Sequence, residues 1–182
     1  AAGGEALVNL GYLNTGGNHI VQESLDTGAF DIFIMGDGMI GKSLVDEIGS
    51  ENFAGSFALK AGNDKSGAIR FKTIASQNGL DGSAPYANES YDAAALIVLA
   101  IQAGKSSDKT SIKDNILSVA NAPGHKILPG QLGKAITFLK NGDAVNYEGA
   151  SMVELDENHD PAGAYAIYEV VGDDFAVAEY LE

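Results

Sequence analysis

The sequence predicts an α/β protein built on a parallel sheet. Short apolar runs alternate with helical patterns over the first sixty residues, and each run ends in a loop rich in Gly or Asn. Hydrophobic residues make up 45% of the 182 residues, which is enough for a sizeable core. The length suits one domain or slightly more.

The first third of the chain predicts three strands and two helices in alternation. Asn14 or Thr15 is placed to cap the first helix, and Gly28 is placed to end it. The expected strands cover residues 6–12, 31–35 and 53–60, and the expected helices carry Val21 with Leu25 and residues 43–48.

The middle of the chain, from Asp64 to about Gly142, predicts four helices and no strand. Residues 91–103 are apolar almost all round, which is typical of a buried helix. Asp108 or Thr110 is placed to cap the third helix. Four helices without a sheet of their own need a partner surface, and we expect that surface to lie outside this chain. The apolar stripes of the other three helices are Ala68, Phe71 and Ala75; Ile112, Ile116 and Val119; and Leu132, Ile136 and Leu139.

The end of the chain predicts strands again, at residues 152–156 and 164–170. From Asn141 to Glu182 there are 11 acidic residues and no Lys or Arg. Acidic and apolar residues alternate there, which indicates strands with an acidic face toward solvent.

Charge and composition exclude several classes of function. The formal net charge is −14, which disfavours nucleic acid and anionic membrane surfaces as partners. The chain has no cysteine, so disulfides, thiolate zinc sites and cysteine nucleophiles are excluded.

The segment from Gly36 to Ser43 fits two nucleotide-binding patterns, G-x-x-x-x-G-K-S and G-x-G-x-x-G. In the first pattern Lys42 would reach the terminal phosphates of a nucleotide. Asp37, however, would place a carboxylate inside a loop meant for phosphate, and the helix that follows is short. A nucleotide-binding enzyme therefore remains the alternative, and a glycine-rich turn between a strand and a helix is the preferred interpretation.

Asp37 suggests a third use for the same turn. A carboxylate at the carboxyl end of a strand, flanked by glycines such as Gly38, suits the ammonium group of a small ligand. Tyr12 and Asn14 follow the first strand and should lie at the same edge of the sheet. An aromatic ring beside a carboxylate is the pairing expected for a small zwitterionic or amide ligand.

Two weaker candidates concern metals and acid–base chemistry. Residues 156–160 have the D-x-N-x-D spacing of a calcium loop, but Pro161 and Ile167 replace the expected Gly and Glu, so a hairpin turn is favoured. His19, His125 and His159 are scattered and show no metal-binding spacing.

Four segments together resemble a known family: GYLNTGG (11–17), FIMGDGM (33–39), SYDAAALIVLAIQ (90–102) and NYEGASMVELDENHDPAGAYAIYEV (146–170). In this order they resemble the C-terminal half of a type I periplasmic solute-binding protein, the branched-chain amino-acid (Leu/Ile/Val-binding) receptor of ABC importers. The resemblance implies two α/β lobes joined by three crossings, with the ligand held between them. Residues 1–62 would belong to the second lobe, residues 63–160 to the first, and residues 161–182 would return to the second.

The resemblance also implies a role for each candidate residue. Asp37 would take the α-ammonium group of an amino acid or amide-like solute, Tyr12 and Tyr91 would wall its side chain, and Asn14 and Gly38 would line the site. The groups for the ligand carboxylate would come from an N-terminal half that this chain lacks. The protein would be no enzyme and would need no cofactor.

Partners and location follow from the same resemblance. The closed form would deliver its solute to a membrane permease from the periplasm, and the precursor would carry a signal peptide. A sensor that serves no transporter fits the sequence equally well. The fragment alone would expose apolar surface, so we expect either a homodimer or a compact core of its own.

Overall fold

The computed structural model describes residues 3–161 and 163–181, which form two compact units. The first unit contains the described residues of Ala1–Gly62 and Tyr165–Glu182, and the second contains those of Asn63–Ala164. Two chain crossings, at Gly62/Asn63 and Ala164/Tyr165, therefore connect the units. No helix in the described residues is both long and apolar enough to cross a bilayer.

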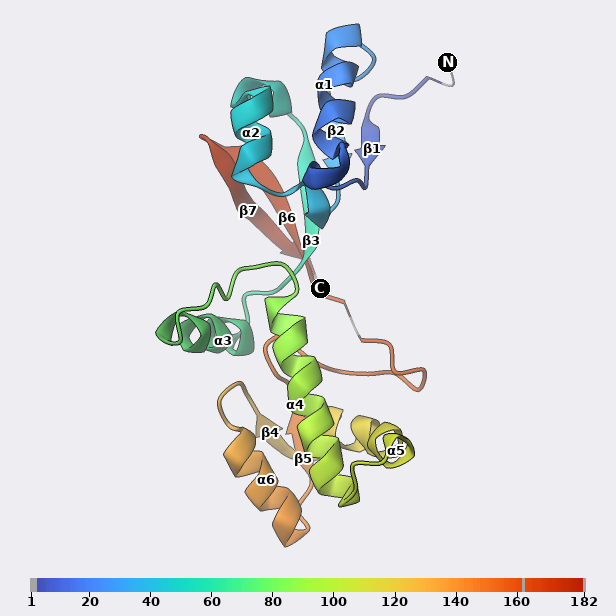
Figure 1. The fold of residues 1–182 in the computed structure, drawn as a ribbon, viewed down its shortest axis with the longest axis vertical. Helices are drawn as coiled ribbons and strands as arrows, with labels where there is room; N and C mark the ends of the chain where they lie inside the picture. The colour runs from blue at the N-terminus through green and yellow to red at the C-terminus, as the bar shows by residue number, and fades with distance from the viewer. Residues whose placement is uncertain (1–2, 162, 182) are drawn as a thin grey trace. The chain divides into compact units, whose positions relative to one another are not determined.

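The first unit is a five-stranded mixed sheet with the strand order β1-β2-β3-β6-β7 (Figure 1). The strands β1, β2 and β3 are parallel, whereas β6 pairs antiparallel with β3 and β7 pairs antiparallel with β6. The predicted α/β class is thus confirmed, with an antiparallel hairpin added to a parallel sheet. Its elements are β1 (Leu7–Asn9), α1 (Gly17–Thr27), β2 (Phe33–Met35), α2 (Lys42–Ile48), β3 (Phe57–Ala61), β6 (Tyr165–Val171) and β7 (Asp174–Leu181), with 3-10 turns at Leu13–Thr15, Asp37–Met39 and Ser50–Phe53.

The core of the first unit lies where α1 and α2 pack on one face of the sheet. Val21 of α1 and Leu44 of α2 are fully buried, and both belong to one apolar cluster with Phe33 and Met35 of β2. Helix α1 ends at Gly28, whose φ of 65° gives the left-handed conformation expected of a glycine C-cap. The burial of Val21 and the stop at Gly28 confirm the sequence prediction for this helix.

The predicted N-cap of α1 is wrong. Neither Asn14 nor Thr15 caps the helix; both lie in a 3-10 turn, and the cap position is Gly16 with a φ of 97°. The reason is the Tyr12 carbonyl oxygen, which accepts hydrogen bonds from the Thr15 amide at 3.2 Å and the Gly17 amide at 2.9 Å. These bonds close a tight turn before the helix can begin.

The third strand also begins later than predicted. Phe53 lies in a 3-10 turn and is buried against the rings of Phe33 and Phe175, with centroids 6.5 Å and 6.2 Å away. The apolar run at 53–60 therefore has two parts: Phe53, a buried residue of a turn, and the strand β3, which begins at Phe57.

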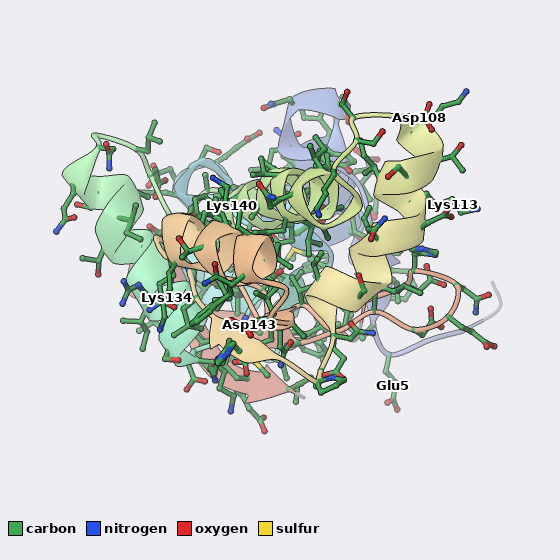
Figure 2. All side chains as sticks on the ribbon, turned by 90° about the horizontal axis from the view of Figure 1, so that it is seen from below. Glu5, Asp108, Lys113, Lys134, Lys140 and Asp143 are labelled. Carbon is green, nitrogen blue, oxygen red and sulfur yellow. The ribbon has the colours of Figure 1, made fainter. Side chains whose placement is uncertain are left out.

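The second unit contains four helices and a small parallel sheet of β4 and β5. The helices confirm the prediction for residues 64–142, and Asp108 caps α5 by accepting a hydrogen bond from the Thr110 amide at 2.9 Å. Figure 2 shows Lys113 of α5 and Lys134 of α6 pointing away from the ribbon. The elements are α3 (Ser66–Gln77), α4 (Ala87–Gly104), α5 (Lys109–Ala120), β4 (His125–Ile127), α6 (Leu132–Asn141) and β5 (Val145–Tyr147).

Two expectations for the helices of this unit are wrong. The helices do have a sheet within the chain, because Ile127 of β4 and Tyr147 of β5 are fully buried in one cluster with α4, α5 and α6. Helix α4 is not buried all round, since Ile97 and Val98 are 45% and 43% exposed. The sequence missed both strands because neither lies in an apolar run: β4 has the sequence HKI and β5 the sequence VNY.

The predicted strand at 152–156 is also wrong. Met152 has a φ of 58°, and Leu155 forms only an isolated bridge with Pro161. Asn121 takes the place of a neighbouring strand: its side chain donates to the Leu155 carbonyl oxygen at 2.7 Å and accepts from the Leu155 amide at 2.9 Å. The strand predicted at 164–170 is confirmed as β6.

Candidate ligand-binding site

The loop between β1 and α1 is held by a buried asparagine. Asn9, only 4% exposed, donates from its side-chain amide to the Gly17 carbonyl oxygen at 3.0 Å and accepts from the Gly11 amide at 3.0 Å. Together with the bonds to the Tyr12 carbonyl oxygen, these contacts fix the path of the loop. Sequence reasoning missed Asn9, although a single polar residue inside the apolar run ALVNLGY was a usable signal.

The loop between β2 and α2 is a tight 3-10 turn that satisfies its own amides. Asp37 accepts a hydrogen bond from the Gly38 amide at 2.9 Å through its side chain. The Met39 amide donates to the Gly36 carbonyl oxygen, and the Ile40 amide donates to the Asp37 carbonyl oxygen, both at 3.1 Å. The Asp37 carboxylate is therefore held in a defined orientation at the end of β2 while its side chain is only half-buried.

These two loops lie side by side because β1 and β2 are parallel neighbours. A Cβ atom added to Gly38 would lie 2.6 Å from Cδ1 of Tyr12 and 2.7 Å from the Gly11 carbonyl oxygen. Only glycine fits this contact, so the Tyr12 ring rests directly on the turn that carries Asp37. Tyr12 is 57% exposed, which leaves an aromatic side chain open to solvent on the turn that carries Asp37. Asn14 is also exposed and lies in the same loop as Tyr12.

The chemistry of this group suits recognition of a small cation. A fixed carboxylate can accept hydrogen bonds from an ammonium group, and an adjacent tyrosine ring offers an apolar face. The missing side chain at Gly38 lets the Tyr12 ring pack directly against the turn. The structure thus brings Tyr12, Asp37 and Gly38 together in the first unit, with Asn14 in the same loop as Tyr12.

The fifth predicted residue, Tyr91, belongs to the second unit and has defined partners there. Its hydroxyl oxygen accepts a hydrogen bond from the Gly130 amide at 2.9 Å, and its ring lies 5.1 Å from that of Phe71. Arg70 donates from Nε to the Pro129 carbonyl oxygen at 2.5 Å, so α3 and α4 both bind this loop. Tyr91 is half-buried and ordered by contacts that the sequence did not reveal.

Next to Tyr91 is a buried carboxylate that sequence reasoning also missed. Asp92 is 2% exposed and accepts hydrogen bonds from the Tyr147 hydroxyl at 2.7 Å, the Ala150 amide at 2.8 Å, and the Ser151 amide and hydroxyl, both at 2.7 Å. Burial and the nearby Asp92 charge raise the pKa of Tyr147 far above its ordinary value. Asp92 therefore fixes the loop after β5, to which Asn63 also binds through the Ala150 carbonyl oxygen at 3.2 Å.

The geometry around Lys42 does not fit phosphate binding. Its ammonium group contacts Asp46 at 2.7 Å and Asp173 at 2.9 Å, and both carboxylates raise the pKa of Lys42. The amides of Gly38, Met39 and Ile40 are used within the turn, as described above. A phosphate would have to displace these bonds and approach the Asp37 carboxylate, so the nucleotide interpretation loses its structural basis.

Within the described residues, no group of three or more His, Asp or Glu side chains is arranged to hold a metal ion, and this includes the loop at residues 156–160. Asp156 accepts hydrogen bonds from the Asp160 amide at 2.9 Å and the Asn158 amide at 2.8 Å, which lower its pKa. The favoured interpretation of this segment as a turn fits these bonds. His125 stacks on Phe138 with ring centroids 3.9 Å apart.

Comparison with known proteins identifies the fold. No model of a known protein family matches the sequence. The leucine-binding protein LivK of Thermotoga maritima matches 97% of this chain with a TM-score of 0.66 and 19% identity. A branched-chain amino-acid ABC transporter protein of Thermus thermophilus with bound valine matches 98% with a TM-score of 0.59 and 19% identity.

The chain has part of the type I periplasmic binding protein fold. LivJ of Streptococcus pneumoniae, solved with isoleucine, agrees with this assignment at a TM-score of 0.61 and 16% identity over 97% of the chain. The chain spans 43–46% of these three solved proteins. A relative in sequence is the chemotactic signal transduction substrate-binding protein BasB of Halobacterium salinarum, 30% identical over 99 residues, which are 54% of this chain and 24% of BasB.

Proposed function

We propose that the chain forms part of a solute-binding protein that recognises a small amino acid or a related amide. The observation that carries this proposal is the contact between the Tyr12 ring and the turn that holds Asp37 at the carboxyl ends of β1 and β2. Asp37 accepts hydrogen bonds from the α-ammonium group, and Tyr12 with Asn14 borders the rest of the solute. Valine and isoleucine are bound in two of the similar structures, which supports an aliphatic amino acid.

The role of Tyr91 as a wall of the site stays a prediction, because Tyr91 belongs to the second unit. The Tyr91 hydroxyl oxygen already accepts a hydrogen bond from the Gly130 amide. We therefore expect Tyr91 to contact a solute through its ring. The site works by binding alone: the solute favours the conformation for which it has the higher affinity. The protein is accordingly no enzyme and carries no cofactor.

The partner of the loaded protein is a membrane permease of an ABC importer, reached on the outer side of the cytoplasmic membrane. The names of the LivJ and Thermus thermophilus proteins, which both refer to a branched-chain amino-acid transporter, support this role. The similarity to BasB supports a second candidate, in which the same solute-bound state is recognised by a chemotactic signal transducer. The two roles share the solute site and differ in the membrane protein that binds the solute-loaded form.

A thermal-shift screen tests the proposed class of solute. We expect branched-chain amino acids or their amides to raise the melting temperature of the chain, because a ligand that binds only the folded state stabilises it. Mg-ATP should leave the melting temperature unchanged, since Lys42 and the turn amides are engaged within the protein. Stabilisation by Mg-ATP that is lost in Lys42→Ala would contradict the proposal.

A further inference from the structure

Asn9, the last residue of β1, binds three separate backbone positions from a buried site. Its side-chain nitrogen donates to the Gly17 carbonyl oxygen, and its side-chain oxygen accepts from the Gly11 amide, both at 3.0 Å. Its own carbonyl oxygen accepts from the Gly36 amide at 3.3 Å. Because Asn9 is only 4% exposed, water is poorly placed to replace a lost hydrogen bond. One residue therefore holds both ends of the first loop and the start of the second.

The two glycines at the ends of the first loop lie directly against the turn between β2 and α2. A Cβ atom added to Gly38 of that turn would lie 2.7 Å from the Gly11 carbonyl oxygen. A Cβ atom added to Gly17 would collide with the sulfur of Met39, which is fully buried at the end of the same turn. The two loops thus touch at two points through backbone that has no side chain. A shift of either end of the first loop must therefore displace the turn.

We propose that Asn9 is a positioning residue of the solute site and sets the separation between the Tyr12 ring and the Asp37 carboxylate. Tyr12 lies inside the loop that Asn9 closes, and its carbonyl oxygen accepts from the Gly17 amide at 2.9 Å. Asp37 lies in the turn against which this loop packs. The effect of Asn9 on solute affinity rests on the proposed function, whereas its effect on the contact between the two loops does not.

The variant Asn9→Asp tests this role because its effect depends on pH. A neutral carboxyl can donate to the Gly17 carbonyl oxygen as asparagine does, whereas an ionised carboxylate cannot donate and is repelled by that oxygen. Burial favours the neutral form, so we expect the change between about pH 5 and about pH 7.5. In two-dimensional amide NMR, Asn9→Asp should bind L-leucine within about threefold of wild type at the lower pH and at least about tenfold more weakly at the higher pH. The ionisable residues of the two loops, Tyr12 and Asp37, are also present in the wild type, which is therefore the reference at each pH.

The matched control is Asn121→Asp in the second unit. The Asn121 side chain also donates to a backbone carbonyl oxygen and accepts from a backbone amide, both of Leu155. Urea denaturation should show a loss of stability in both variants at the higher pH, whereas only Asn9→Asp should lose affinity for L-leucine. If Asn9→Asp does not fold, Gly11→Ala is the second variant, because its Cβ atom would lie 2.9 Å from Oδ1 of Asn9. Gly11→Ala should also weaken L-leucine binding at least about tenfold.

Spectra without solute distinguish this inference from the proposed function. In Asn9→Asp the Gly38 and Met39 amide resonances should move with pH relative to the wild type, together with those of the first loop. If the wild-type chain does not bind L-leucine, the proposed function fails, and these resonances alone decide whether Asn9 positions the turn. Gly38 and Met39 resonances that stay in place, wild-type affinity in folded Asn9→Asp at both pH values, a loss that does not recover at the lower pH, or an equal loss in Asn121→Asp would overturn the proposal.

Discussion

Single residues explain why the two candidate loops keep their shape. Asn9 binds both ends of the first loop through one side chain, and Asp37 binds the amide that follows it in the second. The sequence indicated Asp37, Tyr12 and Gly38, because glycines and a carboxylate after an apolar run have a recognisable pattern. It did not indicate the bond from Gly130 to Tyr91, since the two residues are 39 positions apart and no local pattern relates them.

Asp92 provides a prediction about stability at the residue scale. Replacing it with alanine leaves the Tyr147 hydroxyl and the Ala150 and Ser151 amides without their buried acceptor. We expect Asp92→Ala to lower the free energy of unfolding by about 3 kcal/mol or more. Asp114→Ala, on the exposed side of α5, is the control and should change it by less than about 0.5 kcal/mol. Urea denaturation measures the free energy of unfolding of both variants. Equal losses of stability in Asp92→Ala and Asp114→Ala would contradict the role of Asp92 as a buried acceptor.

Tyr147 provides a prediction about pH. Burial, and then the Asp92 charge, raise the pKa of its hydroxyl, so the neutral form is favoured in the folded protein. Its stabilising contribution is complete below about pH 10, the ordinary pKa of tyrosine, and falls as the pH rises above that value. In an absorbance titration of the folded chain, Tyr147→Phe should leave the ionisation seen near pH 10 unchanged in amplitude. A loss of amplitude there would show that Tyr147 ionises normally.

At the scale of elements, the pattern of apolar residues decided what the sequence could predict. The four long helices of the second unit follow from their apolar stripes, and α1 follows from Val21 and the glycine that ends it. The strands β4 and β5 are as short as β1 and β2 but do not lie in an apolar run that would predict them. The segment at 152–156 has a strand-like alternation, but Asn121 satisfies the Leu155 backbone in place of a strand.

The start of α3 gives a prediction at this scale. Gly67 lies directly against the Gly149 carbonyl oxygen, and an added Cβ would collide with this backbone atom. We expect Gly67→Ala to lower the free energy of unfolding by about 2 kcal/mol or more. Gly133 is also the second residue of a helix, α6, but a Cβ there meets nothing within 4 Å. Gly133→Ala should therefore stabilise the chain by about 0.5–1 kcal/mol. Thermal unfolding measures the stability of both variants. Destabilisation by Gly133→Ala as well as by Gly67→Ala would contradict the view that contact with Gly149 makes Gly67 necessary.

At the scale of the whole molecule, two units with separate cores are joined by two chain crossings. The sequence predicted the α/β class because alternating strands and helices leave a clear pattern. It could not predict that the sheet ends in an antiparallel hairpin, since strand direction depends on which strands become neighbours. The solute site proposed for the first unit needs only the loops after β1 and β2, so the unit should retain measurable affinity for the ammonium end of the solute.

The central claim is that the carboxyl ends of β1 and β2 bind an amino acid through Asp37. Two-dimensional amide NMR of the chain, titrated with L-leucine, tests it most directly because the method detects weak binding. We expect saturable shifts of the Gly11 and Gly38 amides, and an affinity at least about tenfold weaker in Asp37→Asn, where the charge-assisted hydrogen bonds are lost. Absence of these shifts, or an unchanged affinity in Asp37→Asn, would contradict it.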